Sequence, residues 1–448
     1  MTSLRAGAAN ADITPTVGGY MDGYSSRRQP SQGVHDPLFA RVLILDYDAG
    51  GACAIIGCDL LGMHPQVASQ VRERALELFG IQPEAIIVSA THNHAGPAGL
   101  RAGMFGRLNE ALAATVVDSI AAAISKAWAS RREATLKTAS ARLDTIGANR
   151  RDPSLPIDGT VRIALSDSAD GPIACLVNVA CHGTVLNGSN LMLTAEFPGV
   201  ACRIIEDVTG ATPIYLNGAC GDINPAWIAQ DFESVERLGQ VVGGQAVRTI
   251  AEMLSAGRGQ RIHNVRWDEF PNVPVPGRVV EPRLRFARRE VELPARDFLP
   301  DDEYAPVIED ARGTADGAPG ESSERRAAMA RVSRYESERW AAVWAQRSGA
   351  GAMHRTEVQA ISLGEGLAVI ALPGEFFGET GRLIREATGA EQLLIAGYAN
   401  DYVGYVVPDS EYDEGGYECG VTPCAPGAEL IIRQTAIDLL RQVSGNGD

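Results

Sequence analysis

The sequence of 448 residues is short of positive charge, because 40 Lys and Arg face 56 Asp and Glu and leave a net charge of −16. Lysine is nearly absent, occurring as Lys126 and Lys137. Nucleic acids and anionic lipids attract basic surfaces, so this chain is not expected to bind either by electrostatic attraction. The expected partner is a small-molecule substrate that is neutral or cationic.

Long apolar runs are also missing. No stretch reaches the roughly 18 to 20 uncharged apolar residues of a membrane span. The first 15 residues, MTSLRAGAANADITP, lack the apolar core of a secretory signal. We therefore expect a cytoplasmic protein without stable membrane insertion, and the sequence leaves homo-oligomerisation open.

Cysteine is scarce as well. Eight cysteines are too few for a disulfide scaffold in a chain of this length, and they show no paired C-x-x-C pattern of structural zinc sites. We expect most of them to be buried as small apolar side chains. With 45% hydrophobic and 21% charged residues, the composition is that of a globular protein and excludes a disordered one.

The sequence does contain a regular alternation of apolar strands and helical patterns. A strand at residues 52–61, an amphipathic helix at 66–79 and a buried strand at 85–90 predict a parallel crossover. The pattern predicts an α/β fold, with mixed central β-sheets flanked by helices. The other predicted elements are a helix at 109–128 and strands at 38–47, 160–164, 173–180, 212–217 and 366–372.

Residues 297–349 depart from this alternation. They are charged, with Pro, Gly and Ser at 313–323 before a polar helix at 324–345. We expect a surface excursion rather than a domain. Whether it forms a lid, a contact between subunits or plain surface stays open.

Three predicted strands end next to residues that can bind a metal. The strand at 85–90 leads to His92 and His94, the strand at 173–180 to His182, and the strand at 366–372 to Glu375. Side chains two apart on a strand share a face, so His92 and His94 can point into one cleft, as a ligand and a proton shuttle or as two ligands. Two histidines and a glutamate form a catalytic zinc set that leaves a position for water. Taken singly, each histidine also fits the core or surface, and Glu375 fits a helix N-terminus.

These residues lie in motifs that resemble the neutral/alkaline (non-lysosomal) ceramidase family, and specifically its zinc-dependent catalytic domain. The motifs keep one order along nearly the whole chain, and that combination makes the resemblance specific. They are ADITP from Ala11, SATHNHAGP from Ser89, ACHG from Ala180, NGACGDINP from Asn217, LPGEF from Leu372 and NDYVGYV from Asn400.

The resemblance implies a role for each matching residue. The implied zinc ligands are His92, His182, Glu375 and Tyr405. The implied catalytic residues are His94, which moves protons, Arg150, which reaches into the site, and Tyr417, which helps to hold the carbonyl oxygen. The nearest alternatives are Arg151 for Arg150 and Tyr412 for Tyr417.

Two departures limit the transfer. Ceramide-cleaving members carry a serine where this chain has Asn224, and asparagine cannot serve as a nucleophile, so we expect Asn224 to bind a polar substrate group. The chain is also expected to lack the family's C-terminal immunoglobulin-like domain. Because motifs from His92 to Tyr405 must converge on one metal, we expect residues 1–448 to form a single catalytic domain.

The leading hypothesis is a zinc-dependent hydrolase that cleaves an amide bond in a small, soluble N-acyl or related compound, using Zn2+-bound water. Ceramide itself is a weaker candidate because of Asn224. An ester or lactone hydrolase is the first alternative, since those reactions also pass through a tetrahedral intermediate. A non-catalytic zinc or ligand-binding protein is the second, although the open coordination position argues against it.

Overall fold

The structure is a computed structural model. It describes residues 3–48, 50–101, 107–255, 260–261, 272–273, 277–320, 322–348, 353–390 and 392–445.

The first of three large sheets is built by the N-terminal part of the chain. Its strand order is β5-β4-β3-β1-β6. Strands β4 and β5 are parallel and joined through α1, which confirms the predicted crossover. Helix α1 begins at Pro65 and ends before Gly80, whose φ of 69° is the left-handed conformation that glycine adopts without strain. The elements are β1 (Leu4–Asp12), β3 (Phe39–Tyr47), β4 (Gly51–Cys58), α1 (Pro65–Phe79), β5 (Ile86–Ala90) and β6 (Arg132–Glu133).

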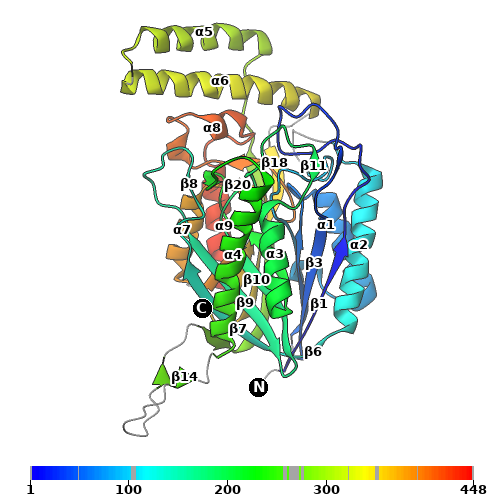
Figure 1. The fold of residues 1–448 in the computed structure, drawn as a ribbon. Coiled ribbons are helices and arrows are strands. Elements are labelled where there is room, and N and C mark those ends of the chain that lie inside the picture. The colour runs from blue at the N-terminus through cyan, green and yellow to red at the C-terminus, as the bar shows by residue number, and fades with distance from the viewer. Residues whose placement is uncertain are drawn as a thin grey trace.

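The second sheet has the order β12-β10-β9-β7-β16 and lies beside the first. Helices α3 and α4 pack on each other and cover its outer face (Figure 1). The elements are β7 (Thr135–Arg142), β9 (Thr160–Ser168), β10 (Gly171–Val179), α3 (Glu196–Thr209), β12 (Thr212–Asn217), α4 (Phe232–Met253) and β16 (Arg278–Val280).

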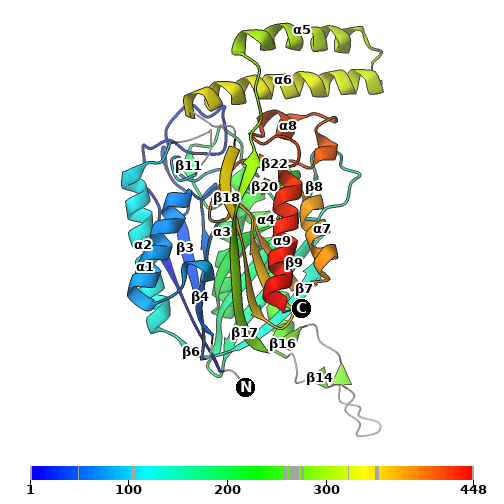
Figure 2. The ribbon, with the colours of Figure 1, turned by 180° about the vertical axis from the view of Figure 1, so that it is seen from behind.

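The third sheet, β17-β18-β19-β21, is covered by α9, with α7 beside it (Figure 2). The sequence analysis missed the long antiparallel pair β17 and β18, because charged side chains on an exposed face hide the strand pattern. The elements are β17 (Pro282–Pro294), β18 (Met353–Gly364), β19 (Leu367–Ala371), α7 (Gly378–Thr388), β21 (Gln392–Ala396) and α9 (Ala428–Ser444).

Several of the short elements, among them β8, β11, β20 and α8, lie at the end of the sheets where the candidate site is found, whereas β14 lies at the other end (Figure 1). Parallel pairing joins β20 to β22, and antiparallel pairing joins β8 to β13. The short elements are β2 (Gly33–Val34), η1 (Pro83–Ala85), β8 (Gly147–Asn149), β11 (Met192–Leu193), β13 (Ile223–Pro225), β14 (Gln260–Arg261), β15 (Asn272–Val273), β20 (Glu375–Phe376), β22 (Tyr405–Val406), η2 (Asp409–Glu411) and α8 (Tyr417–Val421).

The expected excursion at 297–349 contains two helices, α5 (Asp301–Gly317) and α6 (Ser323–Ser348), whereas the sequence predicted only the second. They pack on each other at the outside of the molecule, and α6 lies against α8 (Figure 1). Residues 321 and 349 of this segment lie outside the described residues.

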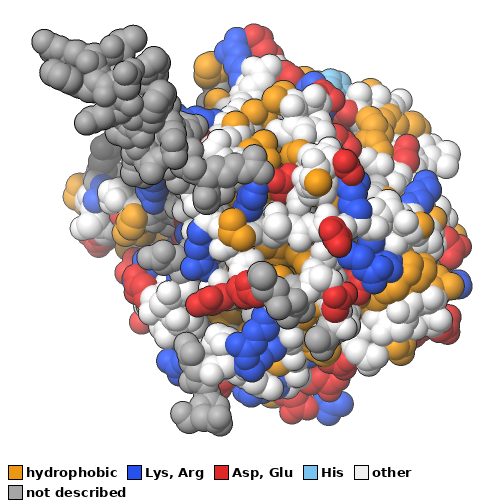
Figure 3. Space-filling model, turned by 90° about the horizontal axis from the view of Figure 1, so that it is seen from below, with side chains coloured by type: hydrophobic (Ala, Val, Ile, Leu, Met, Phe, Trp, Pro, Cys, Tyr) orange, Lys and Arg blue, Asp and Glu red, His pale blue; other side chains and the backbone are white. Residues whose placement is uncertain are grey.

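Helix α2 (Glu110–Ala129) is long and apolar enough to be a candidate membrane span by length and composition. This is weak evidence, because core helices pass the same test, and α2 packs on β1 and β3 with residues such as Ile120 and Ile124 fully buried. All eight cysteines are buried and free, as expected. On the face seen in Figure 3, acidic and basic side chains are interspersed.

Candidate active site

The three predicted strand ends converge at one point, although each belongs to a different sheet. His92 follows β5, His182 follows β10, and Glu375 follows β19. All three side chains are almost fully buried. Asn217 connects the two histidine loops, because its Nδ2 donates to the carbonyls of Thr91 and Cys181 at 3.0 Å each. We call His92, His94, His182 and Glu375 the histidine cluster.

His92 and His94 do share one cleft, but for a different reason from the one predicted. Strand β5 ends at Ala90, and His92 has a left-handed backbone with φ 60° instead of an extended one. The two rings meet edge to face with centroids 4.7 Å apart. Such a conformation costs a non-glycine residue about 1–3 kcal/mol, so the surroundings must hold it. Tyr398 does so by stacking on the His92 ring at 3.8 Å.

Backbone carbonyls fix which nitrogen of each histidine carries the hydrogen. Nδ1 of His92 lies 2.8 Å from the carbonyl of Leu61, and Nδ1 of His182 lies 2.7 Å from that of Cys220. A carbonyl can only accept, so each Nδ1 donates, and each neutral ring keeps a lone pair on Nε2.

Those two lone pairs face the same carboxylate oxygen. Oε2 of Glu375 lies 3.2 Å from Nε2 of His182 and 3.3 Å from Nε2 of His92. Three acceptors pointing at one another repel unless a cation or a proton lies between them. Nε2 of His94 lies 3.1 Å from Nε2 of His92, and its Nδ1 is buried without a hydrogen-bond partner among the described residues.

Burial and neighbouring groups shift the pKa values of His94, His182 and Glu375. Burial lowers the pKa of His182 to about 4 and that of His94 well below its usual value, so both rings are neutral at pH 7. Burial alone would raise the pKa of Glu375, but the imidazoles of His92 and His182 hold it well below its usual range. The ionised carboxylate of Glu375 is therefore buried beside the neutral rings of His94 and His182.

This arrangement fits a metal ion. The ligand nitrogens of His92, His94 and His182 lie within 4.8 Å of one another, and Glu375 adds a carboxylate oxygen. Carbonyl-oriented imidazoles are the usual support of metal-binding histidines.

Tyr402 is a site residue that the sequence analysis did not assign. Its hydroxyl donates to Oε1 of Glu375, the oxygen that does not face the histidines. Arg101 lies 5.6 Å from the Tyr402 ring centroid and pairs with Asp22 at 2.7 Å. The position of Tyr402 in the motif NDYVGYV, three residues before Tyr405, was the available signal.

Arg150 connects several of the predicted residues. Its Nη2 donates to the hydroxyl of Tyr405 at 2.8 Å, and its Nη1 lies 3.3 Å from Oδ1 of Asn224. Its Nε donates to Glu418 at 2.6 Å. Tyr405 is the register partner of Glu375 across β20 and β22, and burial raises its pKa well above the usual value.

Between the pairs left open by the sequence, the structure places Arg150 and Tyr417 nearer the cluster. The Tyr417 ring is about half exposed, lines the cavity over the cluster and lies 6.0 Å from the Tyr405 ring. Arg151 instead pairs with Glu411 and Glu418. Tyr412 donates to the carbonyl of Cys424 at 2.8 Å and is not among the described residues that line this cavity.

The cavity over the cluster has a volume of about 240 Å³. Its walls include Tyr24, whose ring lies 5.1 Å from that of His94, and Trp340 of α6. The excursion at 297–349 is therefore not only surface, because α6 supplies part of the cavity wall. The principal lining residues are Tyr24, His92, His94, Arg101, Trp340, Glu375, Tyr402, Tyr405 and Tyr417.

The chain is similar to known proteins along most of its length. A family model described as neutral/alkaline non-lysosomal ceramidase, N-terminal, matches residues 4–215. The neutral ceramidase of Pseudomonas aeruginosa is 22% identical, over 97% of this chain and 71% of its own length. That of Mycobacterium tuberculosis is also 22% identical, over 97% of this chain and 76% of its own length.

A crystal structure of the P. aeruginosa neutral ceramidase has the same fold, with a TM-score of 0.75 and 20% identity, over all of this chain and 75% of that one. A second solved structure, titled as a ceramidase complexed with C2, has a TM-score of 0.72. The chain is similar to the neutral/alkaline ceramidase family, whose N-terminal model matches residues 4–215. The family model spans His92, Arg150 and His182, and the structural match extends over Glu375 and the tyrosines that follow it.

Proposed function

We propose that the protein is a zinc-dependent hydrolase that cleaves an amide bond in a small N-acyl compound. The observation that carries the proposal is the convergence of Nε2 of His92, Nε2 of His182 and Oε2 of Glu375. Two imidazoles and a carboxylate are a catalytic zinc set with room for a further ligand. We propose Tyr405 as that further protein ligand, since a dication favours ionisation of a buried phenol.

Zinc bound there would polarise the substrate carbonyl and lower the pKa of a water molecule towards 7, from about 15.7. His94 is neutral and has an unpartnered Nδ1 among the described residues, so it can carry a proton from the attacking water to the leaving nitrogen. Tyr417 lines the cavity, and the Arg150 guanidinium lies 5.9 Å from the centroid of its ring, so we assign both as donors to the oxygen that gains negative charge.

The family supports an amide as the bond cleaved, because its relatives are named neutral ceramidases. We propose a soluble N-acyl substrate in the cytoplasm rather than ceramide in a membrane. Asn224 takes the place of the family's serine, and its Oδ1 is positioned by Arg150 to leave the amide available to a polar substrate group.

The test is a substrate screen with purified full-length protein, loaded with zinc or treated with chelator. The panel holds short N-acyl amines, ceramide in detergent, simple esters and lactones. We expect turnover of the N-acyl amines that is lost with chelator and restored by zinc. Turnover of esters or lactones alone would instead support the ester hydrolase, and stoichiometric zinc without turnover of any compound would support a binding protein.

A further inference from the structure

A second cavity is lined by Asn149 and Arg151, the neighbours of Arg150, and by Phe377, and no residue of the histidine cluster is among its described lining residues. Its volume is about 480 Å³. Part of its wall is apolar, formed by Leu155, Pro156, Ile157 and Phe377. The opposite part carries Arg162 of β9 and Arg385 of α7, which we call the arginine pair.

The arginine pair shares a single carboxylate. Arg162 donates through Nη1 to both oxygens of Asp158 at 3.1 and 2.8 Å, and Nη1 of Arg385 lies 2.7 Å from the same carboxylate. The three side chains are only 11–15% exposed. Within the described part of the chain, the buried Nε atoms of both arginines have no hydrogen-bond partner. Two guanidiniums offer about ten N–H donors, more than one carboxylate can accept.

Counted over Arg162, Arg385 and Asp158, the charges leave an excess of one positive charge. Burial would raise the pKa of Asp158, but Arg385 and Arg162 hold it below its usual value. Burial lowers the pKa of Arg385 to about 10, with Asp158 opposing and Arg162 adding to the shift. Asp158 and Arg385 are therefore ionised at pH 7, and the two arginines exceed the one carboxylate that they share by one positive charge. Over the whole lining of the cavity five arginines face five acids, so this excess is local to the arginine pair.

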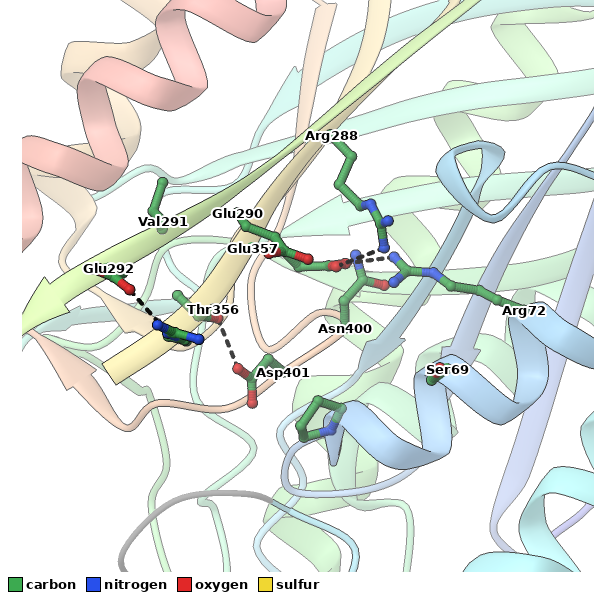
Figure 4. Close-up of a pocket in the computed structure, with 12 residues that line it drawn as sticks. Ser69, Arg72, Arg288, Glu290, Val291, Glu292, Thr356, Glu357, Asn400 and Asp401 are labelled. Atoms are coloured by element: carbon green, nitrogen blue, oxygen red, sulfur yellow. Dashed lines mark hydrogen bonds and ion pairs between the residues drawn. The ribbon is translucent and has the colours of Figure 1, made fainter. Parts of the chain in front are cut away.

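A third cavity, of about 720 Å³, also has arginines in its wall, but there they are not in excess over the acids (Figure 4). There Arg72 and Arg288 both contact Glu357, at 2.6 and 3.1 Å, and Arg355 pairs with Glu292 at 2.9 Å. Glu290 and Asp401 add two more acids to the same wall. Four acids face three arginines in that cavity, whereas five acids face five arginines around the cavity of the arginine pair, so the more acidic cavity is the poorer one for an anion.

We propose that the cavity of the arginine pair binds a small amphiphilic carboxylate, with its carboxylate on Arg162 and Arg385 and its apolar part against Leu155, Ile157 and Phe377. A second carboxylate balances the excess charge, and planar guanidiniums bind carboxylates with paired hydrogen bonds. The apolar wall selects against inorganic anions. The site is separate from the histidine cluster and does not depend on the reaction proposed there.

Isothermal titration of the full-length protein with sodium hexanoate tests the site, with inorganic phosphate and hexylamine as comparison ligands. We expect one hexanoate to bind per chain, and phosphate and hexylamine to bind at least about tenfold more weakly. Arg385→Gln and Arg162→Gln should each weaken hexanoate about tenfold, the loss of one charged hydrogen-bonding partner. Asp158→Asn should tighten it, because it removes the competing carboxylate.

Arg382→Gln is the matched control, since Arg382 lies on the same helix and cavity wall but is already paired with Glu386 at 2.7 Å. Its hexanoate affinity should stay within about twofold of the parent. Circular dichroism establishes whether each variant is folded. If Arg385→Gln does not fold, Arg385→Lys provides a milder change. No hexanoate binding, equal phosphate binding, or binding unchanged in both arginine variants would overturn the proposal, the last by placing hexanoate elsewhere.

Discussion

The histidine cluster and the arginine pair are opposite departures from charge balance in one molecule. In the first, Nε2 of His92 and Nε2 of His182 lie within 3.3 Å of the same carboxylate oxygen of Glu375, and all three are groups that can bind a cation. In the second, Arg162 and Arg385 meet with one carboxylate between them. Buried polar groups are normally matched, so a surplus of acceptors or donors marks the place where a ligand of opposite kind completes the match.

The histidine cluster and the arginine pair also differ in how rigidly their side chains are positioned. Backbone carbonyls, Asn217 and a stacked tyrosine fix the cluster, and β5, β10 and β19 end beside it. The arginines are long side chains, and the acid that both of them contact among the described residues is Asp158. Small, geometrically fixed acceptors suit a metal, whereas longer donors that can adjust suit an organic anion.

The largest expected effect comes from removing the charge of the cluster. Glu375→Gln keeps the shape of the side chain and removes the buried negative charge. Zinc affinity should therefore fall by more than about 100-fold, which is the largest loss usual for a residue that only hydrogen-bonds to a metal ligand. Metal content measured by mass spectrometry after dialysis checks this. Glu379→Gln, an exposed glutamate on α7, is the control that should retain zinc. Full zinc content in Glu375→Gln would show that the cluster is not a metal site.

A smaller effect should separate the wall of the active-site cavity from the metal. Tyr417→Phe removes one hydroxyl that faces the cavity, and kcat should fall roughly 10²-fold, the lower range for loss of an oxyanion donor, while zinc content stays the same. Steady-state kinetics on the substrate found in the screen measure it. Tyr412→Phe is the matched control, because its hydroxyl donates to Cys424. Equal kcat in both variants would remove Tyr417 from the catalytic machinery.

The ion pairs between Asp158 and the arginine pair should make the unfolding free energy depend on pH in the acid range. The folded pKa of Asp158 is depressed, so its ionised form stabilises the fold at pH values above its unfolded pKa of about 3.9, and this stabilisation is lost as the pH falls through the folded pKa. Asp158→Asn should lower the unfolding free energy at pH 7 by about 3 kcal/mol, with a smaller difference below pH 4. Urea unfolding at several pH values measures it. A difference that does not change with pH would mean that Asp158 does not act as an ion pair.

The sequence predicted the meeting of His92, His182 and Glu375, because residues that follow buried strands in an α/β fold gather at strand ends. It did not predict the left-handed turn at His92 or the hydroxyl of Tyr402 on Glu375, which depend on loops contacting one another across the molecule. The arginine pair was invisible for the same reason: Arg162 and Arg385 are 223 residues apart and meet only through the fold. Local sequence patterns predict strands and helices, whereas the pairing of charged groups depends on tertiary contacts between distant residues.

The smallest expected effect concerns α6, which places Trp340 in the wall of the active-site cavity but not on the histidine cluster. Trp340→Ala should leave zinc content and hexanoate binding unchanged and raise KM a few-fold at nearly constant kcat, because it removes contact area that serves ground and transition states alike. Met329→Ala, an exposed residue of the same helix, is the control. A large fall in kcat with constant KM would instead assign Trp340 a role in the transition state, and α6 would then belong with the cluster rather than with the cavity wall alone.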